Sequence, residues 1–282
     1  MTVPPLPAIM IEPLVRAALL EDLGRAGDIT TDAVVPRDAR AETALVARQS
    51  GVIAGLDCAL MAFRLIEPAL TAEIARPDGS AVGGGEIIAT ISGPTRGILS
   101  AERVALNFIC HLSGIASSAA AIVQSIEGHR ARLVCTRKTM PGLRALQKYA
   151  VRVGGGFNHR FGLDDGVLIK DNHVAAAGGL EAAVSRARAA IGHLVKIEIE
   201  VDTLPQLEEA LRLPVDAVLL DNMSLDELRS AVALVGGRLV TEASGRITPE
   251  TAPAVAATGV DLLSSGWLTH SVTALDIGLD WR

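Results

Sequence analysis

Hydrophobic positions in the second half of the chain follow two alternating patterns. Short runs of aliphatic residues are separated by segments of about ten to fifteen residues in which hydrophobic side chains recur at helical spacing. The runs predict six strands, at 132–135, 166–170, 195–201, 216–221, 238–243 and 261–266. The intervening segments predict helices near 142–153, 179–191, 204–212, 224–234 and 249–258. Strands that alternate with helices pair in parallel through right-handed crossovers, so this half predicts a doubly wound sheet or a barrel.

The first half of the chain lacks this regular alternation. Its pattern predicts a helix from Ile11 to about Leu23, followed by a loop, GRAGDITTD. Two strands, at 41–49 and 86–92, are expected on either side of a helix at 55–67, and a long helix, with a possible interruption at Gly114, should follow. This half therefore predicts a mixed α+β unit.

Composition excludes several classes of protein. The 282 residues are 49% hydrophobic, which excludes a disordered chain, and the three cysteines without a CxxC pair exclude a disulfide framework. The net charge of −6 argues against a nucleic-acid partner. No run of about 18 apolar residues predicts a membrane span, and the early prolines do not resemble a signal peptide. We therefore expect a cytoplasmic protein with neither a nucleic-acid nor a membrane partner.

Polar residues recur where the predicted parallel strands end. They are Thr136, Arg137, Lys138, Lys170, Asp171, Asn172, His173, Glu200, Asp202, Asp221, Asn222, Ser244, Gly245, Ser265 and Gly266. Enzymes with parallel α/β folds place their chemistry at these ends, and this recurrence favours a barrel. Helix capping is the alternative explanation for the Asp and Ser residues, but Lys138, Lys170 and Glu200 are poor N-caps.

Charge is distributed unevenly along the chain. Residues 130–170 contain nine basic and two acidic residues, a balance of +7, so the rest of the chain carries −13. Such a concentration of Arg and Lys favours binding of a small polyanion, because guanidinium and ammonium groups match carboxylates and phosphates. A solvated helix face is the alternative interpretation for Arg144, Lys148 and Arg152, which lie in a predicted helix.

Two further patterns suggest a site for charged groups. Glu198 and Glu200 alternate with apolar residues, so in a barrel strand they would face inward and would need a cation or a developing positive charge. An edge strand with one wet face is the alternative. SGRI at 244–247 and SSGW at 264–267 are candidate phosphate cradles, in which backbone N–H groups bind the anion.

One long segment resembles a known family. TRKTMPGLRALQKYAVRVGGGFNHRFGLDDGVLIKDNH at 136–173 is similar to the signature of the decarboxylating quinolinate phosphoribosyltransferases, also called nicotinate-nucleotide pyrophosphorylases (carboxylating). Further similar segments are EDLGRAGDITTD (21–32), SAERVALNFICHLSGIA (100–116), EIEVDTLPQLEEAL (198–211), DAVLLDNMS (216–224), EASGRI (242–247) and THSVTALDIGLD (269–280). The resemblance covers nearly the whole chain.

The resemblance implies an activity and a fold. The activity is that of a pentosyltransferase of NAD biosynthesis, which transfers phosphoribosyl from phosphoribosyl pyrophosphate to quinolinate and releases nicotinate mononucleotide, pyrophosphate and CO2. The implied fold is an N-terminal α/β sandwich-like domain over 1–115, on which the tail 271–282 packs, and a C-terminal incomplete (open) α/β barrel over 116–270 with the active site. This is the architecture of the type II phosphoribosyltransferases, and it implies a homodimer.

The resemblance also implies roles for individual residues. The implied catalytic residues are Lys138, Lys170, Glu200 and Asp221. The implied quinolinate ligands are Arg137, His159, Arg160 and Lys170, with Arg103 contributed across the dimer interface. The implied ligands of phosphoribosyl pyrophosphate are Lys138, Glu200, Asp221, Ser244, Gly245, Arg246, Ser265 and Gly266. Mg²⁺ is the implied cofactor, held near Glu200 and Asp221 through water or substrate.

Two residues depart from the family pattern, and two other functions compete. Arg246 stands where many relatives have a second glycine, and Trp267 replaces a small residue, so either could alter the phosphate cradle. A paralogous enzyme that transfers phosphoribosyl or ribosyl to another base is one alternative, and the TRKT, NHR and KDNH stretches count against it. A non-enzymatic sensor of anionic metabolites is the other, and the carboxylates of Glu200 and Asp221 count against it.

Overall fold

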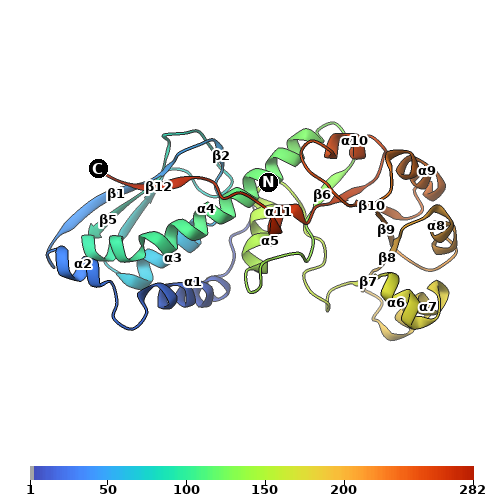
Figure 1. The fold of residues 1–282 in the computed structure, drawn as a ribbon, viewed down its shortest axis with the longest axis horizontal. Coiled ribbons are helices and arrows are strands. Elements are labelled where there is room, and N and C mark those ends of the chain that lie inside the picture. The colour runs from blue at the N-terminus through green and yellow to red at the C-terminus, as the bar shows by residue number, and fades with distance from the viewer. Residues whose placement is uncertain (1–2) are drawn as a thin grey trace. The chain divides into compact units, whose positions relative to one another are not determined.

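The computed structural model describes residues 3–282, and contacts between them divide the chain into two compact units (Figure 1). The first unit holds the chain up to Ala120 together with residues 140–155 and 271–282. The second holds residues 121–139 and 156–270. Residues 140–155 therefore group with the first unit, whereas the expected boundary at 115/116 left them in the barrel domain. Residues 1 and 2 of the expected N-terminal domain lie outside the described residues.

A four-stranded antiparallel sheet forms the scaffold of the first unit, in the order β12-β1-β5-β3. Its strands are β1 (Arg40–Ala47), β3 (Thr71–Ile74), β5 (Ile87–Pro94) and β12 (Ile277–Trp281). Strands β2 (Gly51–Val52) and β4 (Ala81–Val82) form a separate short ribbon. Because β12 comes from the end of the chain and pairs with β1, the C-terminal residues complete the N-terminal sheet.

Five helices accompany this sheet. They are α1 (Ala8–Leu23), α2 (Ile29–Val34), α3 (Leu56–Ile66), α4 (Thr95–Ser125) and α5 (Arg144–Val153). The sequence pattern predicts a loop where α2 lies. The segment is helical because the side chain of Asp28 accepts a hydrogen bond from the Thr31 backbone N–H and so caps the first turn.

Helix α5 is covered on most of its circumference, since residues 146–151 are all buried. The hydroxyl of Tyr149 donates to Asp78 at 2.9 Å, and the Gln147 amide is hydrogen-bonded to the ring of His111 at 2.8 Å. Lys148 is 1% exposed, so the interpretation of this helix as a solvated face is wrong for that residue. These contacts explain why α5 groups with the first unit.

Helix α4 runs without interruption through Gly114. A Cβ at that position would lie 2.3 Å from the backbone oxygen of Thr273, so glycine permits the close approach of the C-terminal tail. By length and composition α4 could cross a membrane, although the sequence pattern predicted no span. Half of its most apolar stretch is buried in the protein, as in a core helix.

A six-stranded, fully parallel sheet forms the second unit, in the order β6-β11-β10-β9-β8-β7. The strands are β6 (Arg132–Val134), β7 (Val167–Ile169), β8 (Ile197–Val201), β9 (Ala217–Asp221), β10 (Val240–Ser244) and β11 (Leu262–Ser264). Their order follows the chain around the sheet, and the first two strands occupy opposite edges. A doubly wound sheet would reverse direction, so the expected open barrel is confirmed.

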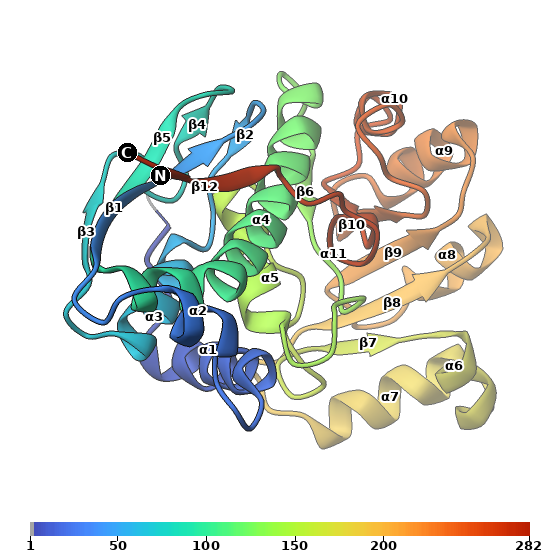
Figure 2. The same ribbon diagram turned by 60° about the vertical axis from the view of Figure 1, so that its left-hand side comes forward.

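Helices follow the strands of this unit. They are α6 (Asp171–Ala177), α7 (Leu180–Ala190), α8 (Leu204–Ala210), α9 (Leu225–Val235), α10 (Ala252–Ala256) and α11 (Trp267–His270). Figure 2 shows α7, α8 and α9 beside the strands that they connect. Capping boxes at Thr203 and Ser224 begin α8 and α9 directly after the ends of β8 and β9. Short connections of this kind leave the carboxyl ends of the strands open to a pocket.

Candidate active site

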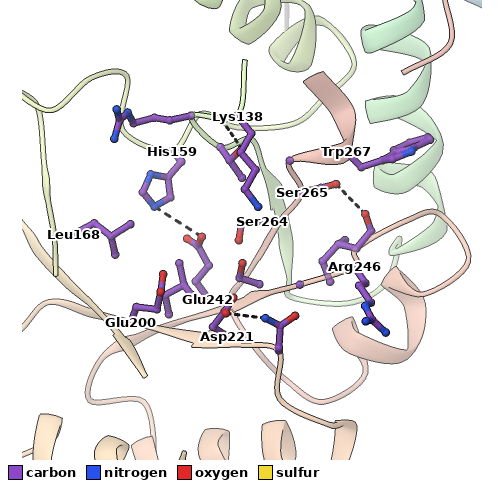
Figure 3. Close-up of a pocket in the computed structure, with 18 of the residues that line it drawn as sticks. Lys138, His159, Leu168, Glu200, Asp221, Glu242, Arg246, Ser264, Ser265 and Trp267 are labelled. Carbon is purple, nitrogen blue, oxygen red and sulfur yellow. Dashed lines mark hydrogen bonds and ion pairs between the residues drawn. The ribbon is translucent and has the colours of Figure 1, made fainter. Parts of the chain in front are cut away.

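A pocket of about 840 Å³ lies at the carboxyl ends of the six parallel strands (Figure 3). Residues at or after the end of every strand line it. The lining includes every site residue predicted in the second unit: Arg137, Lys138, His159, Arg160, Lys170, Glu200, Asp221, Ser244, Gly245, Arg246, Ser265 and Gly266. Arg103 does not line it, because this residue is exposed on α4 in the first unit.

One side of the pocket carries two neighbouring guanidinium groups. Burial and the charge of Arg137 lower the pKa of Arg160, which shows that the two cations influence each other. The buried Nε of Arg137 has no hydrogen-bond partner among the described residues, and Arg160 donates from Nη1 to the carbonyl oxygen of Gly166 at 2.9 Å. Two like charges held together in this way favour an anion that can accept from both.

Glu200 reaches the pocket from β8 and pairs with Lys170, which follows β7. Ile197, Ile199 and Val201 are buried on the other face of the strand, as the alternation predicted. The alternative of an edge strand with a wet face is wrong, because β8 lies between β7 and β9. The carboxylate of Glu200 is therefore held at the mouth by a cation of the same pocket.

The loops after β9 and β10 interlock beside Asp221. The Asn222 side chain donates to Asp221 at 2.7 Å, and its backbone N–H donates to the carbonyl of Ser244 at 2.9 Å. A Cβ on Gly245 would lie 2.4 Å from the amide oxygen of Asn222, so the glycine makes room for this amide. Asn222 thus holds the Asp221 carboxylate, a role that its strand-end position alone did not reveal.

The two predicted phosphate loops also meet in the pocket. Ser265 donates from its hydroxyl to the carbonyl of Ile247 at 2.9 Å and so ties the loops together. Arg246 adopts a φ of 52°, in the left-handed region that a glycine would occupy without strain. Figure 3 shows Trp267 at the rim, with its ring directed away from Glu242 and Asp221. Trp267 therefore leaves the middle of the pocket open.

Sequence reasoning missed one residue of the pocket floor, Glu242 of β10. Its side chain is 1% exposed, and its Oε1 atom has no hydrogen-bond partner within the described part of the chain. Burial, followed by the charge of Glu198, raises its pKa to about 7. The signal was present in the sequence, because Glu242 lies two positions before Ser244 and alternation places both on one face of the strand.

His159 lines the pocket and contacts two carboxyl groups of neighbouring strands. Its Nε2 lies 2.8 Å from a carboxylate oxygen of Glu198 and 3.8 Å from Oε1 of Glu242, while its Nδ1 accepts from the Arg160 backbone N–H at 2.7 Å. An accepting Nδ1 leaves a ring proton on Nε2, which donates to Glu198.

These three side chains bring their ligand atoms within 4.8 Å of one another, close enough to surround a metal ion. The hydrogen bonds argue against that use. A metal needs the lone pair of Nε2, and moving the ring proton to Nδ1 would point it at the Arg160 N–H, which is also a donor. The cluster of His159, Glu198 and Glu242 therefore suits a shared proton better than a metal.

Comparisons with known proteins agree with this geometry. A family model described as "Quinolinate phosphoribosyl transferase, C-terminal domain" matches residues 115–280, and the corresponding N-terminal domain model matches residues 28–113. The "Nicotinate-nucleotide pyrophosphorylase [carboxylating]" of Mycobacterium leprae is 46% identical over 94% of this chain and 95% of its own length. The protein from Bacillus subtilis named "Probable nicotinate-nucleotide pyrophosphorylase [carboxylating]" is 43% identical over 96% of this chain and 93% of its own length.

Solved structures are similar over the whole length. The crystal structure of NadC from Streptococcus pyogenes has a TM-score of 0.94 and 40% identity, and the match covers 99% of each chain. The nicotinate-nucleotide pyrophosphorylase from Francisella tularensis has a TM-score of 0.95 and 36% identity, with 100% of this chain and 99% of the other covered. The similarity therefore includes both compact units and the pocket.

Proposed function

The chain belongs to the quinolinate phosphoribosyltransferase family, and from this premise we propose how its pocket carries out that reaction. The protein transfers phosphoribosyl from phosphoribosyl pyrophosphate to quinolinate and, with loss of CO2, forms nicotinate mononucleotide and pyrophosphate for NAD biosynthesis. One observation carries the assignment of roles. Five Lys or Arg side chains and three carboxyl groups line a single pocket at the ends of parallel strands.

The two neighbouring guanidinium groups bind quinolinate. Arg137 and Arg160 each offer a planar pair of donors, and the substrate carries two carboxylates that accept them. Lys170, already paired with Glu200, adds a third cation on the same side. Holding both carboxylates fixes the direction of the pyridine ring, so that its nitrogen faces the ribosyl carbon.

The loops after β10 and β11 bind the phosphoribosyl group. The backbone N–H groups of 244–247 and 264–267 hold the 5′-phosphate, and Arg246 adds a charge at the rim. Lys138 neutralises the pyrophosphate as it leaves. The ribosyl carbon becomes cationic at that moment, and the carboxylates of Glu200 and Asp221 stabilise it.

The donor set at the mouth fits Mg²⁺. This ion prefers carboxylate oxygens combined with substrate phosphates, and Asp221 offers a carboxylate that accepts only one amide hydrogen bond among the contacts described. Glu200 is already engaged by Lys170, so it would take part through water or substrate. Bound Mg²⁺ would supply charge neutralisation to the pyrophosphate. Binding of Mn²⁺ in the presence of pyrophosphate, followed by electron paramagnetic resonance, should weaken in Asp221→Asn.

The protein acts as a cytoplasmic homodimer in this proposal, and Arg103 completes the partner's pocket. The side chain is exposed on α4 and does not line the pocket of its own chain. Mixing inactive Arg103→Ala with inactive Lys138→Ala should restore about one quarter of the activity, because half of the dimers are mixed and one of their two sites is intact. No recovery despite proven subunit exchange would contradict the shared site.

Calorimetric titration with quinolinate tests the carboxylate site directly. Arg137→Ala should weaken binding by about 2 to 5 kcal/mol, or about 30- to 5,000-fold, since it removes one partner of a desolvated charge pair. Arg152→Ala is the matched control, because Arg152 belongs to the same basic segment but is exposed on α5 and lies outside the pocket. Equal affinities of the parent and Arg137→Ala would contradict this assignment.

A further inference from the structure

The carboxyl group of Glu242 has an environment that the reaction described so far does not use. Glu242 lies on the central strand β10, and Figure 3 shows its carboxyl pointing toward His159, between Glu200 and Ser264. The side chain is 1% exposed but lines the pocket, and its Oε1 atom has no hydrogen-bond partner among residues 3–282. A buried polar atom that lines a cavity and has no hydrogen-bond partner in the protein points to an interaction with a ligand.

Groups from three neighbouring segments surround the carboxyl of Glu242 and act on its protonation. They are Glu198 from β8, His159 from the loop before β7, and the hydroxyl of Ser264 from β11. His159 and the hydrogen bond from Ser264 lower the pKa of Glu242, but burial outweighs them. Burial and the nearby Glu198 carboxylate both oppose ionisation, and the pKa of Glu242 rises to about 7. Near pH 7 a large fraction of Glu242 therefore remains a carboxylic acid.

The reaction of the family requires such an acid. When CO2 leaves the quinolinate ring, the electron pair of the broken bond stays on the ring carbon, and a proton must take the place of the lost carboxylate. Lysine and arginine hold their protons tightly near pH 7, and Glu200 is already engaged by Lys170. An efficient acid has a pKa close to the working pH.

We propose that Glu242 is the catalytic acid that protonates the ring carbon from which CO2 departs. The inference rests on the proposed function and deepens it. The bond between the ring carbon and the carboxylate breaks, CO2 leaves, and the electron pair takes the proton from the Glu242 O–H to form a C–H bond. Glu242 becomes a carboxylate and regains a proton from water before the next turnover. Glu198 acts as a positioning residue, because its nearby charge raises the pKa of Glu242 and so keeps the proton on it.

The charge of the substrate supports this order of events. Quinolinate and phosphoribosyl pyrophosphate bring several negative charges into the pocket, and like charges raise the pKa of a neighbouring carboxyl group further. Glu242 therefore stays protonated while both substrates are bound. Loss of the proton becomes favourable only when the ring carbon carries the electron pair.

Single-turnover measurements of nicotinate mononucleotide and CO2 between pH 6 and about 9 test the proposal. In the parent protein the rate should fall as the pH rises through the pKa of Glu242, at or above about 7. Glu242→Gln should lower the rate by about 100-fold or more, remove this pH dependence and leave quinolinate affinity within about threefold. Glu242→Asp, which keeps an acid, should recover part of the rate.

The matched control is Asp78→Asn. Asp78 is also a carboxyl whose pKa is raised by burial, but it lies in the first unit and outside the pocket, so its variant should keep the parent's pH profile. Glu242→Gln with a rate within about threefold of the parent, or with an unchanged pH profile, overturns the proposal.

Three further outcomes are also decisive. If Glu242→Gln does not fold, a parent rate that stays constant over the same pH range overturns the acid role by itself. A parent protein that forms no product from quinolinate at any pH overturns the proposed function, and the acid role with it. Activity in the parent and in Glu242→Gln alike overturns only the acid role.

Discussion

Each compact unit contains a carboxyl group whose pKa is raised by burial, and the two groups differ in their hydrogen bonds. In the first unit Asp78 accepts from the Leu56 N–H at 3.0 Å, from the Gly55 N–H at 2.8 Å and from the Tyr149 hydroxyl at 2.9 Å. In the second unit Oε1 of Glu242 has no hydrogen-bond partner within the described residues. A carboxyl with its acceptors occupied supports the fold, whereas one left open at a cavity is available for chemistry.

Backbone strain separates the units in the same way. Among the described residues of the first unit, positive φ angles occur only at glycines, such as Gly55 at 88° before α3. In the second unit Asn222 and Arg246 both have a φ of 52°, and both line the pocket. Residues held in unfavourable conformations gather at sites where their side chains are needed. Unfavourable features of the fold are thus concentrated around one pocket.

The largest effect on stability should come from Asp78, whose carboxyl group accepts three hydrogen bonds. Asp78→Ala leaves two backbone N–H groups and the Tyr149 hydroxyl without their acceptor, so we expect a loss of about 4 kcal/mol in the free energy of unfolding. Glu242→Gln at pH 8 should not destabilise the protein, because it removes a carboxylate that is costly to bury. Chemical unfolding of both variants measures the difference. Equal losses of unfolding free energy in the two variants would contradict the distinction between Asp78 and Glu242.

The pH dependence of stability should show the second largest effect. The pKa of Glu242 rises from 4.5 to about 7 on folding, so the unfolded chain ionises first as the pH rises. The contribution of this group to stability is complete below about pH 4.5 and falls by about 3 kcal/mol by pH 7. Unfolding free energies over this range should decline less steeply in Glu242→Gln than in the parent. Parallel curves would show that folding does not raise the pKa of Glu242.

The smallest expected effect comes from relieving backbone strain at the pocket. Arg246→Gly should raise the free energy of unfolding by about 1 kcal/mol, since glycine adopts a positive φ without a steric penalty. The same change should raise the KM for phosphoribosyl pyrophosphate, because it removes a cation from the rim. Thermal unfolding and steady-state kinetics measure the two results. A destabilised variant would mean that the Arg246 side chain supports the fold.

Much of the second unit could be predicted because its strands are short, buried and aliphatic. The segments predicted at 216–221 and 195–201 differ from β9 and β8 by at most two residues at either end. The strands of the first unit are harder to detect. β3 is exposed along its length, and β12 forms only by pairing with β1 from the other end of the chain. Such long-range pairing has no local signal in the sequence.

The residues of the site also divide into those that the sequence pattern could predict and one that it missed. Lys138, Lys170 and Asp221 could be found because strand ends meet at one edge of a parallel sheet. Glu242 was missed although it shares a strand face with Ser244, because a single acidic residue in a strand usually faces water. Its raised pKa depends on burial and on Glu198, which the fold brings in from a distant part of the chain.

Product analysis tests the central claim most directly. The purified protein is incubated with phosphoribosyl pyrophosphate and Mg²⁺, together with either quinolinate or nicotinate. With quinolinate, the account predicts nicotinate mononucleotide, pyrophosphate and CO2 in equal amounts. With nicotinate, which lacks the second carboxylate, it predicts no turnover. Turnover of nicotinate without turnover of quinolinate would contradict the assignment of this pocket.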